Sequence, residues 1–497
     1  MNAQLRHVAV AAAVLIAVLI GATTYWQSWA SAGLANRQGN AVQLVAQLQV
    51  DRGTIFAANG TRLAWSVAHH TNGLTTYSRK YLRNGAFSQV MGYATTGLTQ
   101  AGLELSFNDF LTGSNTTLTN TFAQELDRLG GKTVHGNDIT LTLRPSAQIL
   151  AEQLLAGRCG AVVAMNPQTG AVYVMASSPT YNPNLILKPS GYARIGRIRG
   201  TCGDHTALRN NATQGLYPPG SSFKLITASA ALDTGKVTPT SPFYDPGYCI
   251  EYGKPVYNSG APDSPSGHEV FGNVSFAQAL EYSINAVFCN VGKTIGAASI
   301  LDYAKRYGFY SVPPLDTPQS QSVASGLYKN NKLFDPKDPV TQVDPGRLAF
   351  GQDKMVVTPL QMALVAATIA NGGREPRPYL VQKVTAPDGS VVSRTAPSSL
   401  GHPISAKTAA ELNQMMQLVV QGGTGTAAQI PGVTVAGKTG TAELGLGNLY
   451  DAWFVCFAPA TNPQLAVAVV VEKQPNGFGG SISAPIAKAI LENLLHR

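Results

Sequence analysis

Two residues of the segment YPPGSSFK have the types and the spacing of a nucleophile and its base. Ser221 and Lys224 form the only Ser-x-x-Lys in the chain, and three residues apart on a helix their side chains share a face. Pro219 and Gly220 put Ser221 at the helix N-terminus, where free N–H groups favour a developing oxyanion. Burial and a neighbouring cation would lower the lysine pKa from about 10.4, as a base requires.

Two further motifs supply the remaining groups of a serine acyl-transfer site. They are S-x-N at Ser283 and Asn285, and K-T-G at Lys438, Thr439 and Gly440, followed by Thr441. Each motif alone is short enough to arise by chance, and a lone serine here reads as a helix-terminal or loop hydroxyl. The three motifs together, in this order, predict acyl transfer at a serine. Lys438 is then the candidate for the second cation.

The segment GVTVAGKTGTA, residues 432–442, also fits the pattern G-x-x-x-x-G-K-[ST] of a phosphate-binding loop. Such a loop needs a buried strand before it and a helix after it. GGTGTAAQIP precedes it and GTAELGLGN follows Thr439, and neither sequence suits those elements. The four residues after Gly432 have an extended pattern. The sequence therefore argues against nucleotide binding.

The chain resembles a class B penicillin-binding protein. The segments that carry the resemblance are VVAMNPQTGAVYVMAS, YPPGSSFK, YSINAVF, TPLQMALVAATIANGG, AGKTGTAE and DAWFVCFAP. They cover residues from about 155 to 497. RGTIFAANGTRLA (52–64) and GLELSFNDFLTG (102–113) are similar to the N-terminal motifs of class B proteins. The uncharged turn at residues 57–60 departs from the more charged turn that is usual there.

The resemblance implies a peptidoglycan D,D-transpeptidase that acts on stem peptides. Ser221 would attack the carbonyl of the penultimate D-Ala, and Lys224 would accept its proton. Ser283 would relay a proton between base and leaving group, and Asn285 would hold the substrate amide. An amine of a neighbouring stem peptide would then resolve the acyl-enzyme into a cross-link. β-Lactam antibiotics would acylate Ser221 in place of the substrate, and no metal or cofactor is needed.

The resemblance assigns substrate binding to the K-T-G segment as well as to Asn285. Lys438 would tune the electrostatics, while Thr439 and Thr441 would bind the terminal carboxylate beside Gly440. The N–H groups of Ser221 and Thr441 would form the oxyanion hole.

Several related activities share these motifs. A D,D-carboxypeptidase carries all three, and a non-catalytic β-lactam-binding scaffold of the division machinery is a second alternative. About 130 acid-poor residues before the first hairpin are too few for a glycosyltransferase domain. A serine β-lactamase needs a deacylating Glu, for which the sequence offers no strong candidate. Partners in division or elongation are compatible with the family, and the sequence does not choose between them.

The elements that position these motifs are predicted to form an α+β fold, and the resemblance specifies an antiparallel sheet flanked by helices. We expect a hairpin from about residue 158 with its turn at 166–170, and a strand at 465–472 whose β-branched residues suit a central position. SSFKLITASAALDTG and TPLQMALVAATIANGG read as helices that end at glycines. An amphipathic helix is expected at 486–494. We predict a small α+β module at 27–154 and a transpeptidase domain at 155–497.

The N-terminus predicts a membrane anchor. Residues 8–22 are uncharged and apolar, and 8–26 approach the length of a bilayer span. Arg6 precedes the segment, and Trp26 and Trp29 follow it as interfacial aromatic residues would. We therefore expect a cytoplasmic tail at 1–7, a single span, and a catalytic domain on the extracytoplasmic side of the cell membrane. A cleaved signal peptide ending at Ala30-Ser31-Ala32 is the alternative.

The five cysteines show no zinc-binding spacing. Outside the cytoplasm disulfides are permitted, and proximity in sequence suggests Cys159 with Cys202 and Cys249 with Cys289. Cys456 lies in the apolar run WFVCFAP and is predicted to be a buried free thiol.

Composition excludes one function class. The 497 residues, enough for two or three domains, carry a net charge of +9 that is spread without any Lys/Arg block. Nucleic-acid binding normally needs a concentrated basic surface, so no nucleic-acid partner is expected.

Overall fold

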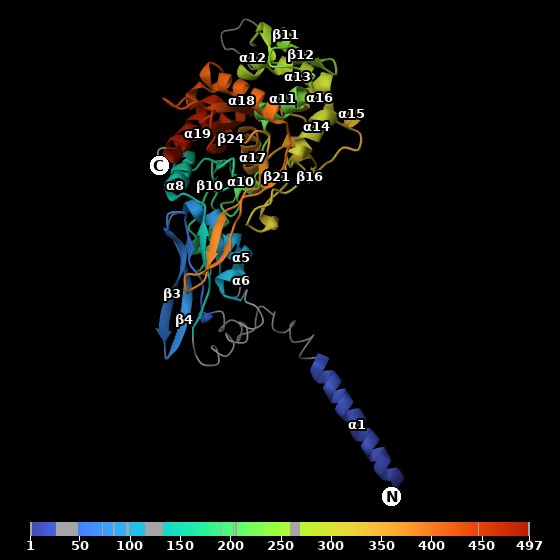
Figure 1. Cartoon of the computed structure of the whole chain (residues 1–497), viewed down its shortest axis with the longest axis vertical. Coiled ribbons are helices and arrows are strands. Elements are labelled where there is room, and N and C mark those ends of the chain that lie inside the picture. The colour runs from blue at the N-terminus through green and yellow to red at the C-terminus, as the bar shows by residue number, and fades with distance from the viewer. Residues whose placement is uncertain are drawn as a thin grey trace.

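The computed structural model of the chain places a small module next to a larger body of helices around a sheet (Figure 1). Every structural statement below concerns the described residues. These are 2–25, 48–71, 73–82, 85–95, 99–114, 133–188, 190–201, 203, 206–258, 269–445 and 447–495.

A five-stranded antiparallel sheet forms the centre of the larger body. Its order is β10 (Val172–Ser178), β9 (Gly160–Met165), β24 (Leu465–Pro475), β23 (Leu449–Ala458) and β22 (Ala436–Glu443). The predicted hairpin and the predicted central strand are both confirmed. Alternate residues of β24 enter opposite cores, with Val467 and Val469 on one face and Ala468 and Val470 on the other. Both faces are buried, which explains the nearly continuous apolar sequence of this strand.

Helices cover both faces of this sheet. On one face pack α8 (Pro145–Leu155) and α19 (Gly479–Leu495). On the other lies α17 (Pro359–Ala370), which Thr358 caps by accepting from the Gln361 N–H. The helix α18 (Ala406–Gln421) packs against β22. The predicted antiparallel sheet flanked by helices is confirmed.

A mainly helical layer lies above α17 in Figure 1, beside α18. Its elements are η4 (Gly220–Phe223), α11 (Lys224–Asp233), α12 (Phe276–Glu281), α13 (Asn285–Ile295), α14 (Ala297–Arg306), α15 (Pro339–Gln342), α16 (Pro345–Leu348) and the antiparallel pairs β11 (Pro242–Asp245) with β14 (Gly272–Ser275) and β12 (Tyr248–Glu251) with β13 (Lys254–Tyr257). The S-x-x-K and S-x-N motifs both lie in this layer.

The second sheet joins two distant parts of the chain. Its order is β20 (Val391–Arg394), β19 (Val381–Thr385), β8 (Asp138–Leu141), β2 (Ile55–Phe56), β3 (Arg62–Thr71) and β4 (Leu74–Tyr81). Residues 381–394 thus complete a sheet that otherwise comes from residues 55–141. β19 therefore pairs across the proposed domain boundary at residue 155, because it comes from the later part of the chain and its partner β8 from the earlier part.

Short elements complete the described chain. The strands are β1 (Val50–Asp51), β5 (Tyr93–Ala94), β6 (Gln100–Ala101), β7 (Val134–His135), β15 (Gly326–Lys329), β16 (Lys332–Leu333), β17 (Met355–Val356), β18 (Glu375–Pro376) and β21 (Ser399–Gly401). The helices are η2 (Gly85–Phe87), α4 (Ser88–Met91), α5 (Gly102–Ser106), α6 (Asn108–Leu111), η3 (Pro183–Leu185), α9 (Gly191–Ile195), α10 (Asn211–Gln214), η5 (Gln319–Gln321) and η6 (Thr426–Ala428).

The N-terminal segment forms α1 (Asn2–Tyr25). Within the described residues, no helix combines the length and the apolar character needed to cross a bilayer. Trp26 and Trp29 of the predicted anchor lie outside those residues.

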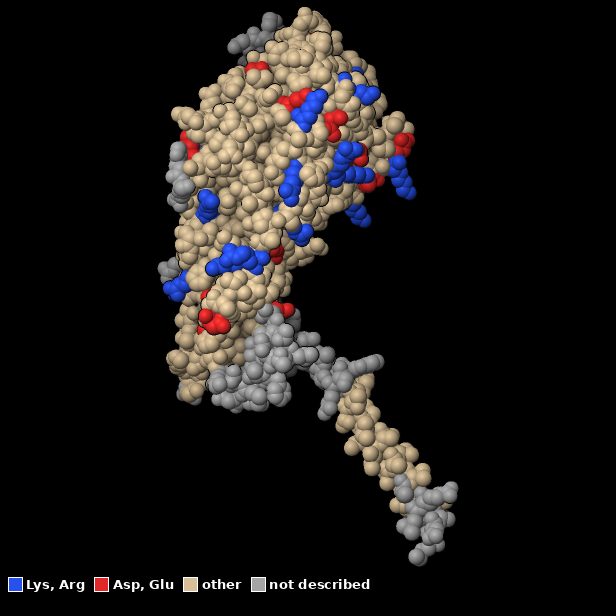
Figure 2. Space-filling view, in the orientation of Figure 1, with Lys and Arg blue, Asp and Glu red and all other residues tan. Residues whose placement is uncertain are grey.

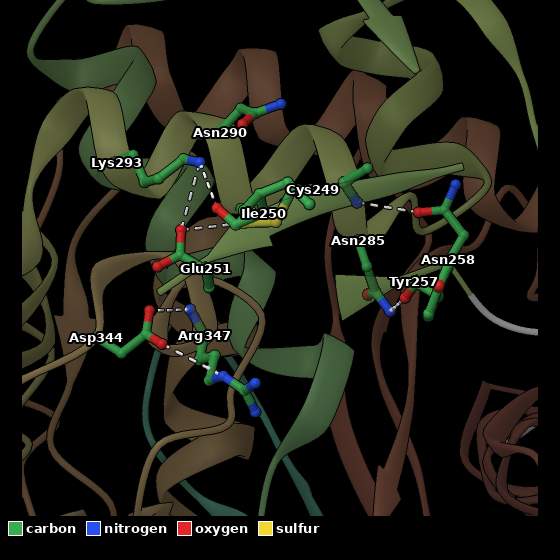
Figure 3. Close-up of a disulfide and its surroundings, with 12 residues drawn as sticks. Cys249, Ile250, Glu251, Tyr257, Asn258, Asn285, Asn290, Lys293, Asp344 and Arg347 are labelled. Atoms are coloured by element: carbon green, nitrogen blue, oxygen red, sulfur yellow. Dashed lines mark hydrogen bonds and ion pairs between the residues drawn. A yellow bond between two sulfur atoms is a disulfide. The ribbon is translucent and has the colours of Figure 1, made fainter. Parts of the chain in front are cut away.

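The cysteines follow the sequence interpretation where the structure describes them. Cys249 and Cys289 form a disulfide with a Cα–Cα distance of 6.4 Å (Figure 3), which confirms that pairing. Cys456 is a buried free thiol, as predicted. Cys202 lies outside the described residues, so its pairing with Cys159 stays a prediction.

Charged side chains are sparse on the face drawn in Figure 2, where Lys and Arg stand in small separate groups. This agrees with the low charged fraction, 13% of the chain.

Candidate active site

The candidate nucleophile lies on a tight turn that leads into α11. Ser221 is the second residue of the 3₁₀ helix η4, and the α-helix begins only at Lys224. The sequence predicted an α-helix from Ser221, and here the structure differs. Gly220 at φ +50° and the bond from Ser222 Oγ to the Pro219 carbonyl (2.7 Å) favour the tighter winding. Residues i and i+3 eclipse in a 3₁₀ helix, so Ser221 and Lys224 still share one face.

Lys224 is completely buried and donates to three uncharged acceptors. Its Nζ lies 2.6 Å from the Ser283 carbonyl oxygen, 3.2 Å from Ser283 Oγ and 2.8 Å from Asn285 Oδ1. Burial, and in second place the charge of Lys438, hold the pKa of Lys224 well below its ordinary value. Lowering the pKa of a lysine increases the fraction of its neutral form, and the neutral amine can accept a proton.

The S-x-N motif lies against Lys224 because of the shape of its backbone. Ser283 adopts φ +60°, in the left-handed region that non-glycine residues rarely occupy. This turn presents both its carbonyl and its hydroxyl to Lys224. Asn285 begins α13 and bridges two groups, since its Oδ1 accepts from Lys224 while its Nδ2 donates to the Tyr257 carbonyl (3.1 Å). The structure therefore brings three of the predicted residues into direct contact.

The K-T-G segment is a β-strand and not a phosphate loop. Lys438, Thr439, Gly440 and Thr441 all belong to β22, the edge strand of the central sheet. No helix follows Thr439, because the strand continues to Glu443. The nucleotide interpretation is excluded by the absence of the strand-loop-helix context that such a loop requires.

Lys438 is a residue of this strand whose side chain is completely buried. Its Nζ donates to the Thr439 carbonyl (3.1 Å) and hydroxyl (3.4 Å), and burial lowers its pKa to about 7. Thr439 Oγ1 also lies 2.6 Å from Thr424 Oγ1, and Thr441 Oγ1 accepts from the Gly479 N–H at 3.3 Å. The hydroxyls of β22 are thus held in place by neighbouring elements.

The nucleophile turn packs directly against β22. A Cβ on Gly220 would lie 2.7 Å from the Thr441 carbonyl oxygen, and one on Gly440 would lie 2.8 Å from the Pro219 carbonyl oxygen. Trp453 Nε1 donates to the Pro218 carbonyl (2.9 Å) and anchors the entry to the turn. Two glycines therefore allow the S-x-x-K and K-T-G motifs to meet.

Sequence reasoning missed Thr424, Tyr257 and Asn258. Their side chains or carbonyls orient predicted site residues, but each lies outside the three motifs. A threonine in QGGTGT or an asparagine in VYNSG carries no local signal for such a role. Within the described residues, the metal-ligand types that gather are Cys249, Glu251 and Cys289, and the disulfide removes both thiolates.

The chain belongs to the penicillin-binding protein transpeptidase family. The family model "Penicillin binding protein transpeptidase domain" matches residues 160–492, and "Penicillin binding protein A dimerisation domain" matches residues 52–139. Peptidoglycan D,D-transpeptidase PbpA of Mycolicibacterium smegmatis is 33% identical, over 99% of this chain and 98% of that protein. The Mycobacterium tuberculosis enzyme of the same name is 34% identical, over 100% and 99%.

Solved structures agree with this assignment. Penicillin-binding protein A from M. tuberculosis as a ceftriaxone acyl-enzyme superposes with a TM-score of 0.78 at 30% identity, covering 90% of this chain and 99% of that one. The penicillin G acyl-enzyme of the same protein gives a TM-score of 0.74 at 32% identity, over 90% and 100%. The resemblance to a class B penicillin-binding protein that the sequence motifs carry is confirmed, and it is to actinobacterial penicillin-binding protein A in particular.

Proposed function

We propose that the protein is a peptidoglycan D,D-transpeptidase whose nucleophile is Ser221, and that residues 155–497 carry this activity. The observation that carries the proposal is the buried contact of Lys224 with Ser283 and Asn285. Lys224 is three residues after Ser221 and lies on the same face of the helix. Relatives at 33–34% identity over nearly the full chain bear that name.

Acylation begins when Lys224, in its neutral form, takes the proton of Ser221 Oγ. The oxygen attacks the carbonyl of the penultimate D-Ala, and the N–H groups of Ser221 and Thr441 hold the oxyanion. Ser283 Oγ passes the proton to the nitrogen of the terminal D-Ala, the C–N bond breaks and D-Ala leaves. Thr439 and Thr441 bind its carboxylate, and the buried side chain of Lys438 in the same strand adds positive charge.

In the second step, the amine of a neighbouring stem peptide attacks the ester carbonyl. The amine loses a proton to Lys224, the ester C–O bond breaks, and Ser221 recovers its proton. A new peptide bond has replaced the one that was broken. A β-lactam acylates Ser221 in the same way, but its opened ring remains attached. Acyl-enzyme structures of the M. tuberculosis protein support this part of the proposal.

Product analysis tests the transpeptidase against the D,D-carboxypeptidase. The purified chain is incubated with a stem peptide ending in D-Ala-D-Ala, with and without an amine acceptor, and both products are measured by mass spectrometry. We expect acceptor-dependent cross-linked product together with released D-Ala, and neither from Ser221→Ala. Hydrolysis alone at every acceptor concentration would identify a carboxypeptidase. If the chain turned over no stem peptide but was still labelled by a β-lactam, the scaffold function would be favoured.

We further propose that residues 8–26 anchor the protein to the cell membrane, with the catalytic domain on the extracytoplasmic side. Support comes from the uncharged sequence of residues 8–25, and from the exposed apolar side chains of α1, such as Leu15 and Leu19. Expression of the full chain beside a chain without residues 2–25 tests this. We expect the full chain in the membrane fraction after an alkaline wash, and equal recovery of both chains in the soluble fraction would contradict the anchor.

A further inference from the structure

The helix that carries Asn285 lacks a cap of its own. α13 begins at Asn285, and its N-cap residue is Ile284, whose side chain makes no capping bond. A helix N-terminus leaves backbone N–H groups that need acceptors. The N–H of Ala286 finds one in Asn258 Oδ1 at 3.0 Å. The cap of this helix is therefore supplied from outside it, by the residue that follows β13.

Asn258 is held rigidly enough to serve this purpose. It is almost completely buried, and its Nδ2 donates to Asp245 Oδ2 (2.8 Å) and to the Glu269 carbonyl (3.0 Å). Asp245 is fully buried and also accepts from the Gly247 and Phe271 N–H groups. A buried network in which each member has partners has one stable arrangement.

The same hairpin contacts Asn285 itself. The carbonyl of Tyr257, the last residue of β13, accepts from Asn285 Nδ2 at 3.1 Å. Figure 3 shows Tyr257 and Asn258 side by side at the start of α13, with both dashed contacts. Two consecutive residues thus fix the first turn of the helix and the plane of the Asn285 amide.

The disulfide attaches this hairpin to α13 one turn further on. Cys289 is four residues after Asn285, so both side chains lie along one side of the helix. Cys249 lies on β12, opposite Val256 of β13, and the two cysteines are joined (Figure 3). Both cysteines are buried, with 3% and 0% exposure, so reductants in solution have little access to the bond.

Lys293 makes a further polar contact between α13 and the β12–β13 hairpin. Lys293 Nζ, one turn beyond Cys289, donates to the Ile250 carbonyl (2.9 Å) and lies 3.5 Å from Glu251 Oε1. Figure 3 shows these groups next to the disulfide. The β12–β13 hairpin therefore follows α13 for two turns, from Asn285 to Lys293.

We propose that the β12–β13 hairpin, joined to α13 by Asn258 and by the Cys249–Cys289 disulfide, positions Asn285 for the acylation step. The proposal rests on the proposed function, in which Lys224 is the base. Asn285 Oδ1 accepts from Lys224 at 2.8 Å and so links the hairpin to that base. A shift at the start of α13 moves this acceptor and the Ser283 carbonyl together. Cys249, Cys289 and Asn258 act through Asn285 and are positioning residues.

Saturation kinetics of acylation by penicillin G test the proposal in the full chain. The variants are Cys249→Ala with Cys289→Ala in one chain, and Asn258→Ala with the disulfide intact. Cys456→Ala is the matched control, because that cysteine is buried and free on β23. The acylation rate constant and the apparent dissociation constant are measured separately, with the thermal midpoint recorded for each protein.

We expect the acylation rate constant to fall by between about 10- and 100-fold in both test variants, since small displacements of catalytic groups have such effects. The apparent dissociation constant should change less than about threefold, and Cys456→Ala should retain the wild-type rate whatever its thermal midpoint. A wild-type rate constant in either folded test variant would overturn the proposal. A wild-type protein that penicillin G does not acylate at Ser221 would instead contradict the proposed function.

Discussion

Lys224 shows how a single residue acquires its chemistry from its surroundings. Its three acceptors, the Ser283 carbonyl and hydroxyl and Asn285 Oδ1, carry no formal charge. Burial removes the solvation of the ammonium, and no anion among these partners compensates for that loss. The neutral form of Lys224 is therefore favoured and its pKa is lowered. Lys438 shifts the balance further in the same direction. The sequence could predict the spacing from Ser221, but the degree of burial depends on the whole fold.

The pH dependence of acylation tests this electrostatic account. Acylation requires neutral Lys224, so its rate should rise with pH through the lowered pKa of that residue. Lys438→Gln removes a neighbouring positive charge, which makes protonated Lys224 less unfavourable and raises its pKa. We therefore expect the acid limb of the acylation profile to move to higher pH, with a lower rate at neutral pH.

Lys407→Gln is the control for this comparison, because Lys407 is exposed on α18. Its profile should match the wild type. An acid limb that stays in place, or moves to lower pH, in Lys438→Gln would reject the role assigned to Lys438.

At the scale of elements, the site depends on the contact between η4 and β22. Gly220→Ala places a Cβ 2.7 Å from the Thr441 carbonyl oxygen, so the turn and the strand must separate. We expect acylation to slow by about tenfold or more, because catalytic groups are sensitive to displacements of this size. Stopped-flow measurement with a chromogenic β-lactam gives the rate.

Gly235→Ala provides a matched control. Gly235 also has positive φ (+67°), but its Cβ would meet no atom within 4 Å. The two variants therefore share the backbone strain and differ in the contact with β22. Equal acylation rates in the two variants would show that the close approach is unimportant.

The sequence predicted the elements better than their junctions. The apolar pattern of LAVAVVVE and the glycine-terminated helices were enough to place β24, α11 and α17. The 3₁₀ turn at Ser221 was missed because its local causes, the positive φ of Gly220 and the bond from Ser222 Oγ to the Pro219 carbonyl, cannot be read from the residue types. Asn258 was missed because it caps a helix that begins at residue 285, which is remote from it in sequence.

At the scale of the molecule, each of the two sheets contacts a segment that comes from the other part of the chain. β8 lies between β19 and β2, and α8, which follows β8 in the sequence, packs against β10 and α19. A chain that begins at residue 155 would lose both elements. No sequence pattern predicts that residues 381–385 pair with residues 138–141, because strand pairing over such distances leaves no local periodicity.

Truncation tests this arrangement. We expect the chain 155–497 to unfold at a lower temperature than the chain 48–497, because β19 loses its partner β8 and becomes an edge strand, and one face of β10 is uncovered. Calorimetry gives both thermal midpoints, and β-lactam labelling reports whether the site survives. Equal midpoints would show that the two sheets are independent.

The identity of the acylated residue tests the central claim most directly. The wild-type chain and Ser221→Ala are treated with penicillin G, and intact mass and the tryptic peptide 210–224 are analysed, with fragmentation to separate Ser221 from Ser222. The account predicts one adduct per wild-type chain, on Ser221, and none on Ser221→Ala. An adduct that persists in Ser221→Ala, or that lies on another residue of the wild-type chain, would contradict it.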